Sequence, residues 1–192
     1  MSLAETQLTL RLSPQEIYRL DNFLFAKQET KQALQAFCQL TELDFLYLAG
    51  ESGTGKTHLL IACAELVQQT DHRVIYLSLS ELVKTAEPAV LQAIEQADLL
   101  CLDDIDAIAG LPEWEEAVFH CFNRLHDAKG RLLVAAQQTP ANSPITLADL
   151  RSRLATGLVY QLVMMTDEQK QQALVLQAQS RGLMITSEVA QY

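Results

Sequence analysis

The chain has 192 residues, 49% of them hydrophobic, which suits one α/β domain with a full core and argues against a disordered protein. Its 24 acidic residues outnumber 14 basic ones, and the formal net charge of −10 disfavours stable non-specific binding to DNA by this chain alone. No apolar run approaches the length that crosses a bilayer, and the N-terminus lacks the apolar segment of a signal peptide. We therefore expect a cytoplasmic protein with no membrane contact, whose first partner is another protein.

The cysteines are expected to be structural. They occur singly within apolar stretches and show no Cys-x-x-Cys spacing: Cys38, Cys63, Cys101 and Cys121. This distribution is typical of small buried side chains in a reducing compartment, rather than of metal ligands or disulfides. The four histidines show no ligand spacing either.

The N-terminal region is predicted to hold an extended segment and two helices. Residues Gln7–Leu12 alternate polar and apolar side chains with the period of an extended chain. Ser13–Glu16 has the N-cap, the proline and the glutamate of a capping box, which predicts a short helix through about Leu20. Apolar residues at helical spacing predict an amphipathic helix next: Ala33, Leu34, Ala36, Phe37 and Leu40.

A phosphate-binding loop follows the apolar strand predicted at Phe45–Ala49 and precedes a predicted helix at 57–69. Its residues match the pattern G-x-x-x-x-G-K-[ST]: Gly50, Glu51, Ser52, Gly53, Thr54, Gly55, Lys56 and Thr57. In such loops backbone N–H groups converge on an anion, the lysine reaches the β- and γ-phosphates, and the last hydroxyl coordinates Mg²⁺. A Gly-rich turn that matches by chance is the alternative, but the strand–loop–helix order favours a site for a nucleoside di- or triphosphate.

The rest of the chain alternates strands with helices. Strands are predicted at 74–77, 99–102, 131–136 and 158–162, and helices at a turn from Ser80, at 88–96, at 113–128, from Thr146 capped with Asp149, and from Thr166 capped with Gln169 to Gly182. Residues 187–192 resemble the first turn of another helix. This order predicts an α/β fold, a five-stranded parallel sheet covered by helices on both faces, followed by the start of a small truncated helical domain.

Two adjacent acids, Asp103 and Asp104, end the buried strand at 99–102. In a P-loop protein the first carboxylate at this place holds Mg²⁺, and the second polarises the attacking water. The alternative is a solvated loop after a core strand. Glutamate is the commoner base in this class, and because aspartate is one methylene shorter we expect slow hydrolysis.

Polar residues at two later points are further candidates. Gln137 and Gln138 end the strand at 131–136, where a side chain can contact the γ-phosphate or order the water, or can simply terminate a strand. Arg153 precedes the last strand, where its guanidinium can reach a neighbouring subunit's nucleotide as an arginine finger or can be a solvated helix end.

The order of these motifs resembles the DnaA/Hda family of AAA+ proteins, and more closely its shorter members, which inactivate the replication initiator. The resemblance is carried by GESGTGKTHLL, by LLCLDDIDAIAG with PEWEEAVFHCFNRLHD, and by DLRSRLATGLVYQL, and it spans about residues 20 to 190. It implies an AAA+ domain that binds ADP or ATP with Mg²⁺. The DNA-binding helix-turn-helix of the initiator has no match in this sequence.

The resemblance also implies roles for single residues. Arg153 corresponds to the arginine finger of the family, and Gln137 stands where the initiator has an acidic sensor I residue, which argues further against self-hydrolysis. The family's sliding-clamp-binding hexapeptide Q-L-x-L-x-L is matched by Gln7, Leu8, Leu10 and Leu12, for which an ordinary edge strand is the alternative. Residues expected next to the bound nucleotide are Phe23, Leu24 and His58, although the segment 24–29 lacks the Gly-x-Asn of the initiators. The sensor II residue of the lid is expected beyond Tyr192.

We expect three parts: an N-terminal extension with the clamp motif at 1–14, a nucleotide-binding domain at 15–164, and the beginning of a helical lid at 165–192. The leading hypothesis is a nucleotide-gated regulator that binds the DNA polymerase III sliding clamp and stimulates ATP hydrolysis by the initiator DnaA, so that replication does not restart. Its association with DNA would be indirect, and a homo-oligomer is left open. The alternatives are an autonomous ATPase or helicase loader acting on DNA, and a small-molecule kinase.

Overall fold

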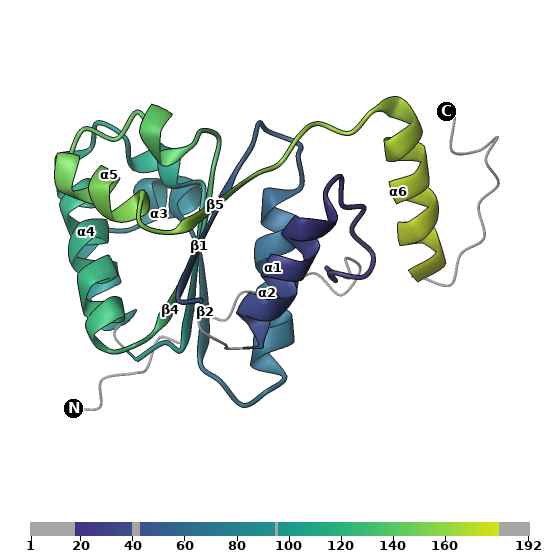
Figure 1. Ribbon diagram of the computed structural model, residues 1–192. Coiled ribbons are helices and arrows are strands. Elements are labelled where there is room, and N and C mark those ends of the chain that lie inside the picture. The colour runs from purple at the N-terminus through teal and green to yellow at the C-terminus, as the bar shows by residue number, and fades with distance from the viewer. Residues whose placement is uncertain (1–17, 40–42, 95, 181–192) are drawn as a thin grey trace.

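The computed structural model describes residues 18–39, 43–94 and 96–180 (Figure 1). The strands are β1 (Phe45–Ala49), β2 (Val74–Ser78), β3 (Leu99–Asp103), β4 (Arg131–Ala136) and β5 (Leu158–Gln161). The α-helices are α1 (Gln28–Cys38), α2 (Lys56–Gln68), α3 (Leu79–Thr85), α4 (Pro112–Asp127), α5 (Ala148–Leu154) and α6 (Asp167–Ser180). Three 3₁₀ segments complete the order, η1 (Pro88–Ile94), η2 (Ile105–Ile108) and η3 (Pro140–Asn142). The predicted clamp motif, the capping box at Ser13–Glu16 and the segment 187–192 lie outside the described residues.

The five strands form one parallel sheet in the order β2-β3-β4-β1-β5, which confirms the predicted α/β fold. Figure 1 shows the sheet edge-on, with α1 and α2 on one side and α3, α4 and α5 on the other. The strands are parallel because each connection between them crosses over one face of the sheet. Their carboxyl ends therefore meet at one edge, where the loops after β1, β3 and β4 lie together.

Two apolar cores lie on the two faces of the sheet. Side chains alternate along β1, so that Leu46 and Leu48 pack on the side of α1 and α2 while Tyr47 packs on the side of α4 and α5. Strands β1 and β3 are buried at every residue, as their continuous apolar runs predict. On the edge strand β5, Leu158 and Val159 are 45% and 41% exposed, so the helices leave part of this edge of the sheet uncovered.

Local chemistry explains where helices differ from expectation. The helix predicted from Pro88 is the 3₁₀ segment η1, and α1 begins at Gln28, five residues before the apolar pattern starts. The capping box predicted at Thr166 is confirmed: the backbone N–H of Thr166 donates to Gln169 Oε1, and the backbone N–H of Gln169 donates to Thr166 Oγ1. The one predicted at Thr146 is wrong: Leu147 is the N-cap residue of α5, with no side-chain cap, and the Thr146 hydroxyl donates to Glu115 at 2.7 Å.

The cysteines are buried and free, as predicted from their apolar surroundings: Cys38, Cys63, Cys101 and Cys121. Burial raises the pKa of the Cys101 thiol, which keeps it neutral inside the core on the α1–α2 face. Within the described part of the chain, no helix combines the length and the apolar composition that a membrane span requires.

Candidate functional site

The loop between β1 and α2 has the backbone of an anion cradle. Gly53 and Gly55 have φ values of 83° and 88°, in the left-handed region that glycine enters without a Cβ clash. Gly55 is the N-cap residue of α2, so the first turn of this 13-residue helix directs its free N–H groups toward the loop. A Cβ at Gly50 would lie 2.7 Å from the Thr54 hydroxyl oxygen, so that position also requires glycine. The loop therefore has the shape and the dipole that a phosphate group requires.

The ammonium group of Lys56 is held inside this loop. Its Nζ donates to the carbonyl oxygens of Gly50 and Glu51 at 2.7 and 2.9 Å, and the residue is 7% exposed. These carbonyls belong to the loop itself, so the charge is already placed where a phosphate group would be bound. A phosphate oxygen is a stronger acceptor for an ammonium group than a neutral carbonyl.

A hydroxyl and a carboxylate meet beside the loop, on α2 and at the end of β3. Thr57 Oγ1 donates to Asp103 Oδ2 at 2.7 Å, and the Tyr76 hydroxyl donates to the same oxygen at 2.8 Å. The backbone N–H of Asp104 donates to the other oxygen of Asp103 at 3.0 Å. Hydroxyl and carboxylate oxygens are the ligands that Mg²⁺ prefers, so Thr57 and Asp103 fit a magnesium ion bound with a nucleotide. Burial raises the pKa of Tyr76, which keeps its hydroxyl protonated and donating.

Asp104 lies beside this pair with its backbone in the left-handed region, at φ 55° and ψ 48°. Ser80, in α3, donates from its hydroxyl to Asp104 Oδ2 at 2.7 Å, and the hydroxyls of Ser80 and Ser78 are 3.0 Å apart. A non-glycine residue in this conformation is uncommon and marks a position that its surroundings determine. The second acid is therefore fixed beside Asp103 by a hydroxyl from the adjacent element α3.

A third acid, Asp106 in η2, was not identified from the sequence. One oxygen accepts the backbone N–H of Gln137 at the end of β4, and the other, Oδ1, is buried with no hydrogen-bond partner among the described residues. Burial raises the pKa of Asp106, against the lowering effect of that hydrogen bond and of Lys56. A buried acceptor without a partner is costly, and it is typical of a site where a bound group completes the hydrogen bonding. The feature of the sequence that could have identified Asp106 is the run Asp-Asp-Ile-Asp at 103–106.

Gln137 itself is exposed and lines a hollow of about 580 Å³ beside the phosphate loop. Amide and hydroxyl side chains from the loop after β4 and from β5 line the same hollow: Gln138, Thr139, Asn142 and Gln161. Gly50, Glu51 and Thr54 form its other wall. Gln137 thus lies across this hollow from the phosphate loop, and its backbone N–H donates to Asp106.

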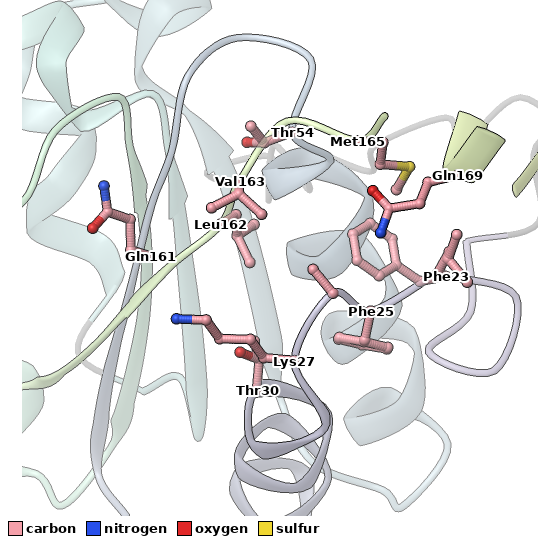
Figure 2. A pocket seen from close by; sticks show the side chains of 12 residues that line it. Phe23, Phe25, Lys27, Thr30, Thr54, Gln161, Leu162, Val163, Met165 and Gln169 are labelled. Atoms are coloured by element: carbon pink, nitrogen blue, oxygen red, sulfur yellow. The ribbon is translucent and has the colours of Figure 1, made fainter. Parts of the chain in front are cut away.

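Phe23 and Leu24, two of the residues expected beside the nucleotide, line a second, narrow pocket. Phe23 and Leu24 face Leu162, Val163 and other residues that follow β5, and the pocket volume is about 20 Å³, enough for water rather than for a base. Figure 2 shows Met165 and Gln169 on the same side of this pocket as Phe23, with Gln161 well apart from them.

Phe23 closes this pocket against the phosphate loop. A Cβ on Gly55 would meet its ring at 2.4 Å. The ring of His58 lies between those of Tyr18 and Phe23, at centroid distances of 5.3 and 5.2 Å. The structure thus brings His58 and Phe23 together beside the loop, at one end of α2.

Arg153 lies apart from this site. It is in the last turn of α5. Its guanidinium is exposed, and it forms no ion pair or hydrogen bond with any described residue. The neighbouring Arg151 instead donates to the carbonyl oxygen of Ile145 at 3.0 Å. Arg153 does not line the hollow beside the phosphate loop, so it is free to contact another molecule.

Glu115, which the sequence analysis also missed, connects this region to α4. It is 1% exposed and accepts hydrogen bonds from Gly110, Thr146 and Leu147. Its signal in the sequence is its spacing: Glu115 stands at the start of the apolar series Val118, Phe122, Leu125, where a helix of this pattern buries a hydrophobic residue.

Comparison with known proteins agrees with this geometry. Residues 15–161 match the bacterial DnaA ATPase domain. An uncharacterized protein of Haemophilus influenzae is 42% identical over 149 residues, which are 77% of this chain and 64% of that protein. This chain therefore spans less than two thirds of that relative's length.

Two solved structures of the replication initiator DnaA share the fold. Domain III of the Thermotoga maritima protein is 25% identical with a TM-score of 0.78, and the match covers 91% of this chain and 78% of that one. DnaA from Aquifex aeolicus, solved bound to AMPPCP, is 23% identical with a TM-score of 0.74 over 91% of this chain and 59% of that one. That protein binds an adenine nucleotide analogue. From its motifs, its sheet order and these matches, the chain belongs to the family of bacterial DnaA ATPase domains.

Proposed function

We propose that this protein is an adenine-nucleotide-binding regulator that stimulates ATP hydrolysis by the replication initiator DnaA and so prevents a second round of initiation. In this proposal its own nucleotide site acts as a switch, and the hydrolysis takes place on the partner. The observation that carries the proposal is the exposed, unpaired guanidinium of Arg153 on a helix that lies apart from the protein's own phosphate loop.

The residues of the site have assigned roles in this proposal. The loop at Gly50–Thr57 holds the phosphates of ADP or ATP, and Lys56 transfers its hydrogen bonds from loop carbonyls to phosphate oxygens. Thr57 and Asp103 hold Mg²⁺, which when bound neutralises phosphate charge. Asp104 and Gln137 would orient the attacking water, and Phe23 and Leu24, with the ring of His58 against Phe23, would form the wall on the side of the nucleobase.

Slow intrinsic turnover follows from the local chemistry. Asp104 has its carboxylate held by Ser80, and aspartate reaches less far than the glutamate usual at this position. Gln137 supplies a neutral amide where the initiators have an acid. A bound nucleotide is then retained, which suits a switch better than a cycling motor.

The guanidinium of Arg153 would stabilise the charge that develops on the γ-phosphate of ATP bound to DnaA. An arginine supplied in this way is worth about 10³–10⁵ in rate to the site that it completes. The net charge of −10 supports a protein rather than DNA as the direct partner of this surface. The hexapeptide at Gln7–Leu12 would attach the regulator to the sliding clamp, with the glutamine in a polar subpocket and the leucines in an apolar groove.

The test is ATP hydrolysis by purified DnaA, measured with this protein and with the sliding clamp loaded on DNA. We expect Arg153→Ala to reduce the stimulated rate by about 10³-fold, whereas the neighbouring Arg151→Ala retains most of it. Arg153→Lys keeps the charge but loses the planar fork, and we expect it to fall between the two. An Arg153→Ala protein that stimulates as well as the wild type would contradict the assignment.

The same assay distinguishes an autonomous motor. If the protein by itself hydrolyses ATP rapidly and DNA accelerates it, an ATPase or helicase loader acting on DNA replaces the proposed regulator.

Removal of the sliding clamp, or the change of Gln7 to alanine, should abolish stimulation at low protein concentration without changing nucleotide binding.

A further inference from the structure

A single buried carboxylate joins three segments on the α4–α5 face of the sheet. Glu115 Oε1 accepts the backbone N–H groups of Gly110 and Thr146 at 2.8 and 3.0 Å. Oε2 accepts the hydroxyl of Thr146 and the backbone N–H of Leu147, both at 2.7 Å. Gly110 follows η2, directly after the acids of the nucleotide site, and Leu147 is the N-cap residue of α5.

A charged side chain at this buried position needs an explanation. A buried carboxylate is costly unless hydrogen bonds replace its hydration, and an apolar residue on this face of α4 would pack without that cost. However, an apolar residue would leave the N–H groups of Gly110, Thr146 and Leu147 without acceptors. Burial raises the pKa of Glu115, but the hydrogen bonds from Thr146, Gly110 and Leu147 outweigh it and lower the pKa, so the side chain is ionised.

These bonds orient the start of α5, together with the bond from Arg151 to the carbonyl oxygen of Ile145, because the rest of the packing of this helix is apolar and not directional. The helix has only seven residues, fewer than two turns, and contacts the core through the fully buried Leu150 and Leu154. Apolar contacts hold the helix on the core but permit small rotations, whereas hydrogen bonds have preferred directions. The three bonds from Thr146 and Leu147 therefore help to fix the direction in which Arg153, six residues after Leu147, leaves the surface.

We infer that Glu115 is a positioning residue for Arg153: its carboxylate clamps the start of α5 to the loop that follows the nucleotide site. This inference rests on the proposed function for its effect on hydrolysis, but the hydrogen bonds of Glu115 to the start of α5 are a property of this chain. Through Gly110 the same carboxylate ties the direction of the arginine to the segment that carries Asp103 and Asp104.

The experiment uses four variants of the whole protein in the stimulated DnaA assay. Glu115→Gln places an NH₂ group against N–H donors, and Thr146→Val removes one donor while keeping the shape of the side chain. Glu116→Gln, an exposed acid on the same helix, is the matched control for the lost charge, and Arg153→Ala defines complete loss. Each variant is titrated to saturation, so that the maximal rate and the half-saturating concentration are obtained separately.

We expect Glu115→Gln to lower the maximal stimulated rate by about 10- to 100-fold, since an error of about 1 Å in a catalytic group has effects of this size. Its half-saturating concentration should stay within about twofold of the wild type. We expect a smaller loss for Thr146→Val and none for Glu116→Gln. A variant that is merely less folded would instead need more protein to reach an unchanged maximum, and that result would overturn the positioning role.

Amide hydrogen exchange tests, in the absence of DnaA, whether the hydrogen bonds of Glu115 hold the start of α5. In Glu115→Gln, exchange of the amides at 146–154 should increase by at least about tenfold, while α2 exchanges as in the wild type. Unchanged exchange in α5 would overturn the inference whatever the hydrolysis assay gives. If Arg153→Ala stimulates normally, the proposed function fails. The exchange data then still support or overturn the inference that Glu115 holds the start of α5.

Discussion

Two regions of the molecule hold acidic side chains with buried oxygens: the edge of the sheet after β3, and the corner where α4 meets the start of α5. At the corner, Glu115 accepts bonds mostly from backbone N–H groups, and both of its oxygens are satisfied. At the edge, Asp106 has one buried oxygen with no partner among the described residues, and two of the donors to Asp103 are side-chain hydroxyls.

The difference separates a structural acid from acids that are available to a ligand. Backbone donors cannot turn to another acceptor without moving the chain, so the bonds of Glu115 are part of the fold. Hydroxyls rotate at little cost, so Thr57 can leave Asp103 for a metal ion without any change in the backbone. The region beside the phosphate loop therefore holds acceptor atoms that are unused or easily released, Asp106 Oδ1 and Asp103 Oδ2.

The largest effect that we expect is on stability, at the corner. Glu115→Ala leaves three backbone N–H groups without their acceptor, and we expect the free energy of unfolding to fall by about 4 kcal/mol. Glu116→Ala, on the exposed side of the same helix, should change it by less than about 0.5 kcal/mol. Urea unfolding followed by circular dichroism measures both. Equal losses in the two variants would show that the hydrogen bonds of Glu115 do not stabilise the fold.

The next effect concerns binding, at the edge. Lys56→Ala removes an ammonium group that forms charge-assisted hydrogen bonds, and we expect the affinity for Mg²⁺-ADP to fall by about 100-fold. Stability without nucleotide should change much less than in Glu115→Ala. Calorimetric titration with ADP, using the exposed Lys84→Ala as control, tests this expectation. Retention of full affinity would show that the loop does not bind the phosphates through Lys56.

The pH dependence of stability should have opposite signs in the two regions. Folding lowers the pKa of Glu115, so its ionised form stabilises the fold above the unfolded-state pKa of about 4.3, and this contribution is lost as the pH falls through the folded value. Folding raises the pKa of Asp106, so its contribution is present below about pH 3.9 and is lost as the pH rises through the folded value.

Two variants separate these contributions. The destabilisation caused by Glu115→Gln should shrink between pH 7 and pH 3, whereas Asp106→Asn should be more favourable, relative to the wild type, at pH 7 than at pH 3. Unfolding free energies measured across this range give both differences. A common sign for the two would mean that the carboxylates experience similar surroundings.

The smallest effects come from a matched pair of hydroxyl deletions. Tyr76→Phe and Thr146→Val each remove one hydrogen bond to a carboxylate, at 2.8 and 2.7 Å, and each should cost about 1 kcal/mol of stability. Only Tyr76→Phe should change the Mg²⁺ dependence of nucleotide binding, because Tyr76 orients Asp103. Titration of the variants with ADP at several Mg²⁺ concentrations would show it. A change of similar size in Thr146→Val would argue that the two regions are coupled.

Sequence patterns predicted well wherever the structure depends on neighbours along the chain. The apolar runs at Phe45–Ala49 and Leu99–Asp103 became fully buried strands, and the Thr166–Gln169 capping box formed as written. The phosphate loop was recognisable because its glycines, lysine and threonine act within eight consecutive residues. Thr146 shows the limit: the same pattern forms no cap, since Glu115, from a different helix, accepts both the backbone N–H and the hydroxyl of Thr146, and Leu147 is the N-cap residue of α5.

The sequence by itself determined the alternation of strands and helices, the phosphate-binding loop and the acids that follow β3, since each depends on residue type and local spacing. Tertiary structure alone decided that Thr57 and Tyr76 converge on the carboxylate of Asp103 and that Glu115 fastens the start of α5. Hydrogen bonds between segments more than thirty residues apart, such as the bond from Thr146 to Glu115, leave no periodic trace in a sequence, because they depend on how the crossovers bring the ends of separate elements together.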